Sequence, residues 1–392
     1  MLPPKNVIKI SSFISMTALL AAQGSACSQH AQTSHSNKDS EPVMEQKIHL
    51  SGPQDGAQVS FLSREQKAFF SDPYRVTPHT PAIEPRKTDL THPVPVKFVW
   101  EGGTGKSVLE ISGSADFKKL VRQVEGKSRK LKNGRIQFHA EIVNLEHGRK
   151  YFWRAVQGNK FSVIRTFTTA DEQPRWISVP NVTNVRDLGG WKTASGKRIR
   201  QGMIFRGGQF DPPWTNQPGG SAVTEAGREI LLKELKIHTE LDLRGVKDKG
   251  ALPGIPRYEL IPLQAYATWQ EQGIFSGEQR KQVKKIFELF ADPSSYPIYF
   301  HCQGGGDRTG TLAFLLENML GVSEADCLND YELSNLSVSG ERSRFSEVWI
   351  KFMEKLETVV PGRSRQEQVC GFLRECGVAD DMQEKIRSIL LE

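Results

Sequence analysis

The chain has 392 residues, a length that predicts two or three domains rather than one. Apolar residues make up 38% of the chain, so it can bury hydrophobic cores. The net charge of +7 is spread along the sequence and suits a protein that attracts anionic substrates. Because we find neither a clustered basic patch nor a nucleic-acid-binding motif, we expect no nucleic-acid partner.

The first 26 residues have the pattern of a secretory signal peptide. Lys5 and Lys9 give a positive start, and an apolar stretch over 10–22 is too short for a comfortable transmembrane helix. Cys27 follows Gly-Ser-Ala, which is similar to a bacterial lipoprotein cleavage site. Plain cleavage and lipidation of Cys27 both stay open. Either predicts export to the periplasm or to the cell envelope, with a membrane tether in the second case.

A polar segment over 27–45 predicts a flexible linker. Residues 46–170 then read as β structure, with Trp100 and Trp153 expected in its core. Residues 62–93 lack a clear period and are expected to form an insertion or a wrapped loop. Apolar residues alternate, as in half-buried strands, over 94–100, 136–142, 151–156 and 161–169.

From about residue 175 the pattern changes to strands that alternate with helices, which predicts an α/β domain over 175–392. We expect a parallel or mixed sheet covered on both faces. Residues 258–279, with Tyr266, Trp269 and Phe275, are expected to form a flap beside the pocket. The expected helices lie at 224–235, 279–290, after 308 and after Ser323, and the expected strands at 237–243 and 298–301.

The motif that carries chemistry is the loop His301-Cys302-Gln303-Gly304-Gly305-Gly306-Asp307-Arg308-Thr309-Gly310, between an apolar strand and a helical pattern. Five residues between a cysteine and an arginine allow successive backbone N–H groups to point inward and bind an anion. Glycines relieve the restrictions on φ, and the helix N-terminus adds its positive dipole end. The predicted phosphate-binding residues are Gln303, Gly304, Gly305, Gly306, Asp307, Arg308 and Thr309.

Cys302 is the predicted nucleophile, because the same positive field stabilises a thiolate directly below the bound phosphate. Arg308 can form two parallel hydrogen bonds with phosphoryl oxygens. Thr309 is expected to donate a hydrogen bond to the Cys302 sulfur. The alternative is a buried structural cysteine in a glycine-rich turn, and the strand before the loop and the helix after it favour the catalytic interpretation.

The loop resembles the H-C-x5-R-[ST]-G signature of cysteine-dependent protein tyrosine phosphatases. Further segments resemble, in order, a bacterial group of tyrosine and dual-specificity phosphatases whose members often also act on phosphoinositides. The resemblance covers about residues 178–340. The segments are Asn184–Gly190 (N-x-R-D-x-G-G), Phe205-Arg206, Leu241–Arg244 (a D-L-R strand) and Asp330–Ser334 (D-Y-x-x-S).

This resemblance implies that Cys302 is the nucleophile and that Arg308 binds phosphate. It makes Asp307 the first candidate for the general acid, since the chain contains no W-P-D motif. Asp187 is the second candidate, on a turn expected to lie beside Arg308, and a purely structural role for it is equally expected. His301 is expected to shape the loop by a hydrogen bond. The implied mechanism needs no metal and no cofactor.

The chain departs from the group's common G-K-D pattern, because Gly306 stands where a lysine often lies. That weakens the phosphoinositide alternative. Asp242 and Arg244 are expected to form a structural pair at a strand end. Lys247, Lys249 and Arg257 lie near the expected flap, in a direction that the sequence does not define.

Residues 145–151 resemble the L-x-P-G-T-x-Y corner of fibronectin type III domains, and 165–169 resemble the last strand of that fold. A seven-stranded β-sandwich that serves as a spacer or adhesion module is the prediction for 46–170. Of the other cysteines, Cys327 is expected to be a buried hydrophobe. Cys370 and Cys376 are either a disulfide or a free pair.

The sequence therefore predicts an exported two-domain phosphatase that hydrolyses phosphate monoesters through a phosphocysteine. Phosphotyrosine in proteins is the leading substrate, with phosphoserine and phosphothreonine next. Two alternatives stay open: an inositol phosphate or phosphoinositide phosphatase, and a non-catalytic phosphate-binding module. The expected partner is a phosphorylated protein or small molecule, and the sequence does not indicate an oligomeric state.

Overall fold

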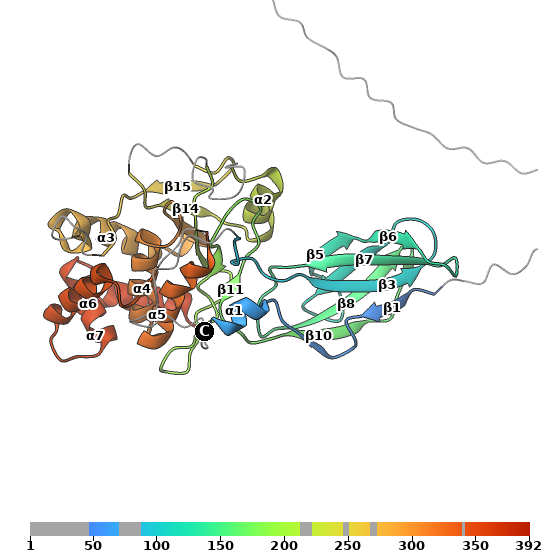
Figure 1. Ribbon diagram of the computed structural model, residues 1–392, viewed down its shortest axis with the longest axis horizontal. Helices are drawn as coiled ribbons and strands as arrows, with labels where there is room; N and C mark the ends of the chain where they lie inside the picture. Colours follow the sequence, from blue (N-terminus) through green and yellow to red (C-terminus); the bar gives the residue numbers. More distant parts are fainter. Residues whose placement is uncertain (1–46, 70–87, 212–221, 246–250, 267–272, 339–341) are drawn as a thin grey trace, which may run out of the picture. The chain divides into compact units, whose positions relative to one another are not determined.

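The computed structural model describes residues 47–69, 88–211, 222–245, 251–266, 273–338 and 342–392 (Figure 1). The signal peptide predicted over 1–26, the linker over 27–45 and the tether at Cys27 lie outside these ranges. Within them, no helix has both the length and the apolar character that crossing a bilayer requires.

Two sheets share one hydrophobic core in the N-terminal half (Figure 1). Phe98 and Trp100 of one sheet and Trp153 of the other are fully buried there, which confirms the core role expected for both tryptophans. Val94, placed in the first expected strand, precedes that strand and is 42% exposed. One sheet has the order β1 (His49–Gly52), β3 (Val96–Gly102), β7 (Ile136–Ile142), β6 (Lys127–Lys130). The other has the order β2 (Ala57–Val59), β10 (Arg165–Thr169), β8 (Lys150–Gln157), β4 (Val108–Ser112), β5 (Leu120–Glu125), with β9 (Lys160–Phe161) paired to β8.

The stretch expected as an insertion contains the short helix α1 (Arg64–Ala68). Ser63 caps this helix in a capping box with Gln66. Leu62 and Phe69 on either side of it pack into the core of the C-terminal half. The insertion therefore contributes to the core of the domain that follows. Its residues 70–87 lie outside the described ranges.

A mixed sheet forms the centre of the C-terminal half, as predicted. Its order is β11 (Arg175–Trp176), β12 (Arg186–Asp187), β13 (Ile204–Gly207), β16 (Ile298–His301), β14 (Thr239–Asp242), β15 (Arg257–Leu260). The last four strands in this order are parallel, and the first two are antiparallel to their neighbours. The carboxyl ends of the parallel strands meet at one edge, and β16 ends there at His301, directly before Cys302.

Helices cover both faces of this sheet. Ile204 and Phe300 pack with the larger helical layer, whereas Phe205 and Tyr299 pack with a second cluster that includes Leu231. The alternation follows from the two-residue period of a strand. On the second face lie α2 (Glu225–Glu229) and the π-helical turn η1 (Ile230–Glu234). The larger layer contains α3 (Gly277–Phe290), α4 (Arg308–Leu320), α5 (Glu324–Glu332), α6 (Glu347–Val359), α7 (Arg365–Glu375) and α8 (Asp380–Leu390), with the 3₁₀ turns η2 (Gly273–Phe275), η3 (Pro293–Ser295) and η4 (Leu333–Leu336).

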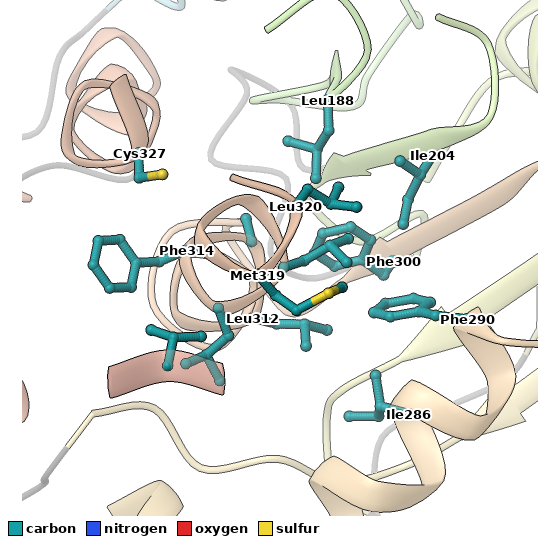
Figure 2. Packing of buried hydrophobic residues seen from close by; sticks show 14 of the residues in the cluster. Leu188, Ile204, Ile286, Phe290, Phe300, Leu312, Phe314, Met319, Leu320 and Cys327 are labelled. Carbon is teal, nitrogen blue, oxygen red and sulfur yellow. The ribbon is translucent and has the colours of Figure 1, made fainter. Parts of the chain in front are cut away.

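Helix α4 follows the phosphate loop and is buried on all sides (Figure 2). Figure 2 shows Leu320 facing Leu188 and Ile204, and Met319 facing Phe290 and Phe300. Phe314 points the opposite way, toward Cys327. Because the helix is wedged between sheet and helices, its N-terminus at Arg308 has a fixed position.

The expected helix starts are confirmed by their caps. The hydroxyl of Thr224 accepts from Gly227 N at 3.0 Å, and that of Ser323 accepts from Asp326 N at 3.1 Å. Ser276 caps α3 in the same way, and the helix begins at Gly277, two residues before the start that the pattern predicts.

Candidate active site

The loop from Cys302 to Asp307 joins the end of β16 to the start of α4. Cys302 is only 4% exposed, at the base of the loop. The helix begins at Arg308, so its unpaired N–H groups and its dipole face the loop, as the sequence predicts.

Donors outside the loop hold the carbonyl oxygens of three successive loop residues. In a trans peptide the C=O and the following N–H point in opposite directions. Carbonyls held outward therefore turn the next N–H groups toward the inside of the loop, where they form the predicted anion nest. The bonds run from Gln209 N to Gln303 O (3.0 Å), from Asn184 Nδ2 to Gly304 O (3.1 Å) and from Arg206 Nη2 to Gly305 O (2.9 Å).

Of the three loop glycines, only Gly305 has a positive φ, at 72°. A Cβ there would also lie 2.6 Å from the backbone of Gly207. Gly304 and Gly306 do not have a left-handed backbone, so the expected need for glycine on conformational grounds applies to Gly305 alone.

A buried cluster of charges fixes the back of the loop. Asp330 accepts from Arg186 Nε at 2.7 Å and forms a close ion pair with Arg206, which in turn holds Gly305. Asn184 accepts from Arg186 at 2.5 Å and donates to the Ser334 hydroxyl at 3.1 Å. The three motifs that the sequence singled out, around 184–190, 205–206 and 330–334, thus meet behind the nest.

The buried surroundings shift the pKa values of the charged groups in this cluster in different directions. Burial works against ionisation of Asp330, but Arg186 and Arg206 keep the pKa of Asp330 below its ordinary value. Burial and the neighbouring charge of Arg186 lower the pKa of Arg206 to about 10. Burial and the negative charge of Asp330 raise the pKa of Glu317 well above its ordinary value. Asp330 is therefore the counter-ion that both arginines require.

His301 is fully buried beside the nucleophile. Its Nε2 lies 3.0 Å from Glu240 Oε1, and its Nδ1 lies 3.1 Å from the carbonyl oxygen of Cys302. Burial disfavours a charged ring, but the bond with Glu240 and the field of Asp242 raise the pKa of His301. These contacts confirm the expected role in shaping the loop.

Arg308 lies at the mouth of the loop, and its Nη1 donates to Leu243 O at 3.4 Å. The hydroxyl of Thr309 is buried and has no hydrogen-bond partner among the described residues, so the predicted bond to the Cys302 sulfur is not formed. Beside Arg308 opens a pocket of about 780 Å³ that Asp307, Tyr266 and Val348 also line.

Asp307 stands at the rim of the nest, with its side chain 48% exposed. Its Oδ1 accepts from Tyr266 Oη at 2.7 Å, and its Oδ2 accepts from Arg342 Nη2 at 2.7 Å. Tyr266 Oη lies 2.9 Å from Tyr331 Oη. Asp307 is thus held in place by side chains from two other segments, and it lines the pocket beside Arg308.

The structure corrects the alternative prediction that Asp187 lies beside Arg308. Asp187 is fully buried, and its Oδ2 accepts from Arg175 Nη1 at 2.5 Å and from Gly202 N at 2.6 Å. Its Oδ1 accepts from Gly189 N at 2.7 Å. With both oxygens engaged by these donors, Asp187 has a structural role.

Replacing Asp187 by asparagine is accordingly expected to lower the free energy of unfolding by about 2 kcal/mol, because Arg175 loses its buried counter-charge. The ratio of kcat for good and poor leaving groups should stay that of the wild type. Urea unfolding and steady-state rates on two aryl phosphates measure both. A change in that ratio would return Asp187 to the proton-transfer step.

Other predicted residues have clear positions. Arg244 and Asp242 form the expected structural pair, with Nε–Oδ1 at 2.9 Å and Nη2–Oδ2 at 2.7 Å. Arg257 pairs with Glu259 at 2.9 Å and with Asp292 at 3.1 Å. Lys247, Lys249 and Trp269 lie outside the described residues.

The three cysteines away from the loop that the structure describes are free thiols. Cys327 is fully buried, as expected of a small hydrophobe, and its Sγ lies 3.7 Å from Val322 O. Cys370 and Cys376 are free as well, which decides between the two alternatives for that pair. Across the part of the chain that the structure describes, no group of three or more His, Cys, Asp or Glu side chains is arranged to hold a metal ion.

Sequence reasoning missed three residues of the site. The sequence does not predict Arg342 as part of the site, it predicts Tyr266 in a flap without a partner, and it does not predict the contact between Glu240 and His301. The partners of Tyr266 and Arg342 lie 41 and 35 residues away in the sequence, beyond the reach of local patterns. The D-L-R strand does signal Glu240, because Glu240 precedes that motif on β14, next to β16.

A sequence model of the tyrosine phosphatase family matches residues 177–392, more than half of the chain. A Cupriavidus necator protein, provisionally named a tyrosine-protein phosphatase, is 25% identical over 183 residues, which are 41% of this chain and 63% of that protein. A tyrosine-protein phosphatase of Nostoc commune is 32% identical over 78 residues, 20% of this chain and 24% of that protein. The matches span less than two thirds of either relative's own length.

Among solved structures, the core catalytic domain of the PP-IP phosphatase SIW14 from S. cerevisiae, in complex with citrate, matches with 14% identity and a TM-score of 0.27. The match covers 46% of this chain and 93% of that domain. A likeness at this level defines neither the fold nor the substrate of the present chain.

Proposed function

Because the chain belongs to the tyrosine phosphatase family, we propose that it hydrolyses phosphate monoesters through a phosphocysteine at Cys302. The observation that carries the proposal is the nest itself. A nearly buried cysteine lies at the base of a loop whose carbonyls are held outward, with Arg308 at its mouth. A module that only binds phosphate needs no nucleophile at that position.

In the first step the Cys302 thiolate attacks phosphorus, and the bond from phosphorus to the ester oxygen breaks. The loop N–H groups and Arg308 stabilise the transferring phosphoryl group. Asp307 gives its proton to the departing oxygen. In the second step Asp307 takes a proton from water, whose oxygen attacks phosphorus. The bond between sulfur and phosphorus breaks, which restores the Cys302 thiolate and releases inorganic phosphate.

Phosphotyrosine is the leading substrate, supported by the walls of the pocket beside Arg308. Leu263, Tyr266 and Val348 line it, and such side chains suit an aromatic ring. Phosphoserine and phosphothreonine are the next candidates. An inositol phosphate or phosphoinositide is the second candidate class, and the guanidinium of Arg342 beside Gly306 favours it by adding a positive charge at the loop.

Hydrolysis by the full-length protein tests the proposal, with reductant present and divalent metals chelated. The substrates are a phosphotyrosine peptide, a phosphoserine peptide, a phosphoinositide and inositol hexakisphosphate. Turnover of peptides alone supports a protein phosphatase, and turnover of the inositol compounds alone supports the second class. If the protein hydrolyses none of the four substrates but still binds phosphate, the non-catalytic phosphate-binding module is the remaining alternative.

Replacing Asp307 by asparagine should slow poor leaving groups by about 10²-fold or more, because these require protonation as they depart. Good leaving groups, which leave as anions, should be slowed less. Steady-state kcat on aryl phosphates of graded leaving-group pKa gives the comparison. Equal losses across the series would assign the acid to another group.

The N-terminal half and the export signal complete the proposal. A fibronectin type III-like sandwich is supported by Tyr151, whose Oη accepts from Glu146 N at 3.2 Å, as in a tyrosine corner. We propose that it serves as a spacer between the catalytic half and the envelope, with export directed by residues 1–26 and either free release or lipidation at Cys27. Fatty-acid labelling of the wild type and of Cys27→Ser in a bacterial host distinguishes these two forms.

A further inference from the structure

A guanidinium group occupies the place where a side chain at position 306 would begin. A Cβ atom built on Gly306 would lie 2.6 Å from Nε, 2.7 Å from Nη2 and 2.9 Å from Cζ of Arg342. The backbone of Gly306 is not left-handed, so its conformation alone does not demand glycine. The missing side chain at 306 leaves the space that Arg342 fills.

The backbone that carries Arg342 is fixed independently of the loop. Asn335 Nδ2 donates to Arg342 O at 2.6 Å, and Asn335 Oδ1 accepts from Arg342 N. Two residues later Arg344 binds both oxygens of Glu332, at 2.9 and 2.5 Å. These bonds hold the Cα of Arg342 in place, so its side chain has a defined reach toward the loop.

Arg342 brings its charge close to the reacting group. Its side chain is 14% exposed and pairs with Asp307 at 2.7 Å. Burial opposes the charge of the guanidinium, but Asp307, and after it Tyr266, Tyr331 and Cys302, raise the pKa of Arg342 above its ordinary value. A phosphate dianion that enters the nest meets this guanidinium, whose planar fork fits two phosphoryl oxygens.

We propose that Arg342 is a second phosphate-binding arginine of this site and supplies the cationic group that the loop lacks at position 306. Arg308 holds the phosphoryl group from the helix side, and Arg342 holds it from the Gly306 side. The inference rests on the proposed function, since it names a further substrate-binding residue of the same loop.

Phosphate binding without turnover tests this role. In a Cys302→Ser background, inorganic phosphate is titrated into the full-length protein by calorimetry. Arg342→Ala is expected to raise the Kd about tenfold or more, because charge-assisted bonds to the dianion are lost. Arg257→Ala, which removes an arginine paired with Glu259 and Asp292 elsewhere, is the matched control and should leave the Kd unchanged.

Substitutions at position 306 give a second, independent test of the role of Arg342. Gly306→Ala with Arg342 retained should raise the Kd several-fold, because the added Cβ pushes the guanidinium aside. In the Arg342→Ala protein the same change should have no further effect. Gly306→Lys in the Arg342→Ala protein should recover most of the lost affinity, since a cation then reaches the nest from the loop itself.

A Kd within about twofold of the background for a folded Arg342→Ala protein would overturn the inference, as would a loss that disappears once Asp307 is replaced by asparagine. The latter result would mean that Arg342 acts only by holding Asp307. If the Arg342→Ala protein does not fold, the phosphate Kd of the Gly306→Ala protein tests the inference instead. If the wild type binds phosphate normally but turns over no substrate, the proposed phosphatase activity is wrong and the phosphate-binding role of Arg342 is unaffected. If the wild type does not bind phosphate, both proposals are wrong.

Discussion

Replacing Cys302 by serine is expected to abolish turnover, with a fall in kcat of more than about 10⁴-fold. A neutral hydroxyl is a far weaker nucleophile than a thiolate, and Cys302 is the one cysteine within the loop itself. The loop N–H groups and Arg308 are unchanged, so inorganic phosphate should still bind. Steady-state rates on a phosphotyrosine peptide and calorimetry with phosphate measure the two effects.

Cys376→Ser is the matched control, because it makes the same exchange at a buried free thiol outside the loop, at the end of α7. Its rates should equal those of the wild type. Substantial turnover by the Cys302→Ser protein, after exclusion of contaminating phosphatases, would remove the cysteine mechanism.

Replacing Asp330 by asparagine should have the largest effect on stability, a loss of about 3–5 kcal/mol in the free energy of unfolding. Arg186 and Arg206 are both fully buried and would lose their shared counter-ion. Phosphate affinity should fall as well, because Arg206 holds the carbonyl of Gly305. Urea unfolding and phosphate titration report the two losses.

The same carboxylate makes stability depend on pH. Because folding lowers the pKa of Asp330, its contribution is complete above the ordinary aspartate value of 3.8 and is lost as the pH falls through the lower value of the folded state. The Asp330→Asn protein should lack this part of the acid transition.

Glu317→Gln provides the control in the same buried cluster. Burial and Asp330 raise the pKa of Glu317 and so disfavour its charged form, and glutamine preserves the size of the side chain. Its loss should stay within about 1 kcal/mol. An equal loss for Asp330→Asn and Glu317→Gln would show that the two arginines do not depend on Asp330.

Local signals were enough to predict the parts of the site that are continuous in sequence. The strand Ile298–His301 and the helix that begins near Arg308 are confirmed, because a short apolar run and a 3.6-residue period define them without help from the rest of the chain. The loop between them follows directly. Its position at the carboxyl edge of a parallel strand is a consequence of the α/β pattern.

The sequence leaves open which of two aspartates is the general acid, and hydrogen-bond partners that are distant in the sequence distinguish them. Asp187 and Asp307 are both carboxylates beside glycine-rich turns, and only their partners separate them. Arg175 and two backbone amides bury the first, while Tyr266 and Arg342 hold the second at the rim. Gly306 gives a similar lesson, because the guanidinium that lies beside it belongs to Arg342, in another segment of the chain.

The central claim is most directly tested by identifying the residue that carries phosphate during turnover. The full-length protein is mixed with a phosphotyrosine peptide, quenched in acid within the first turnovers, digested and analysed by mass spectrometry. We expect phosphate on the peptide that contains Cys302. Phosphate on a different side chain, or steady turnover with none on Cys302 at any quench time, would contradict it.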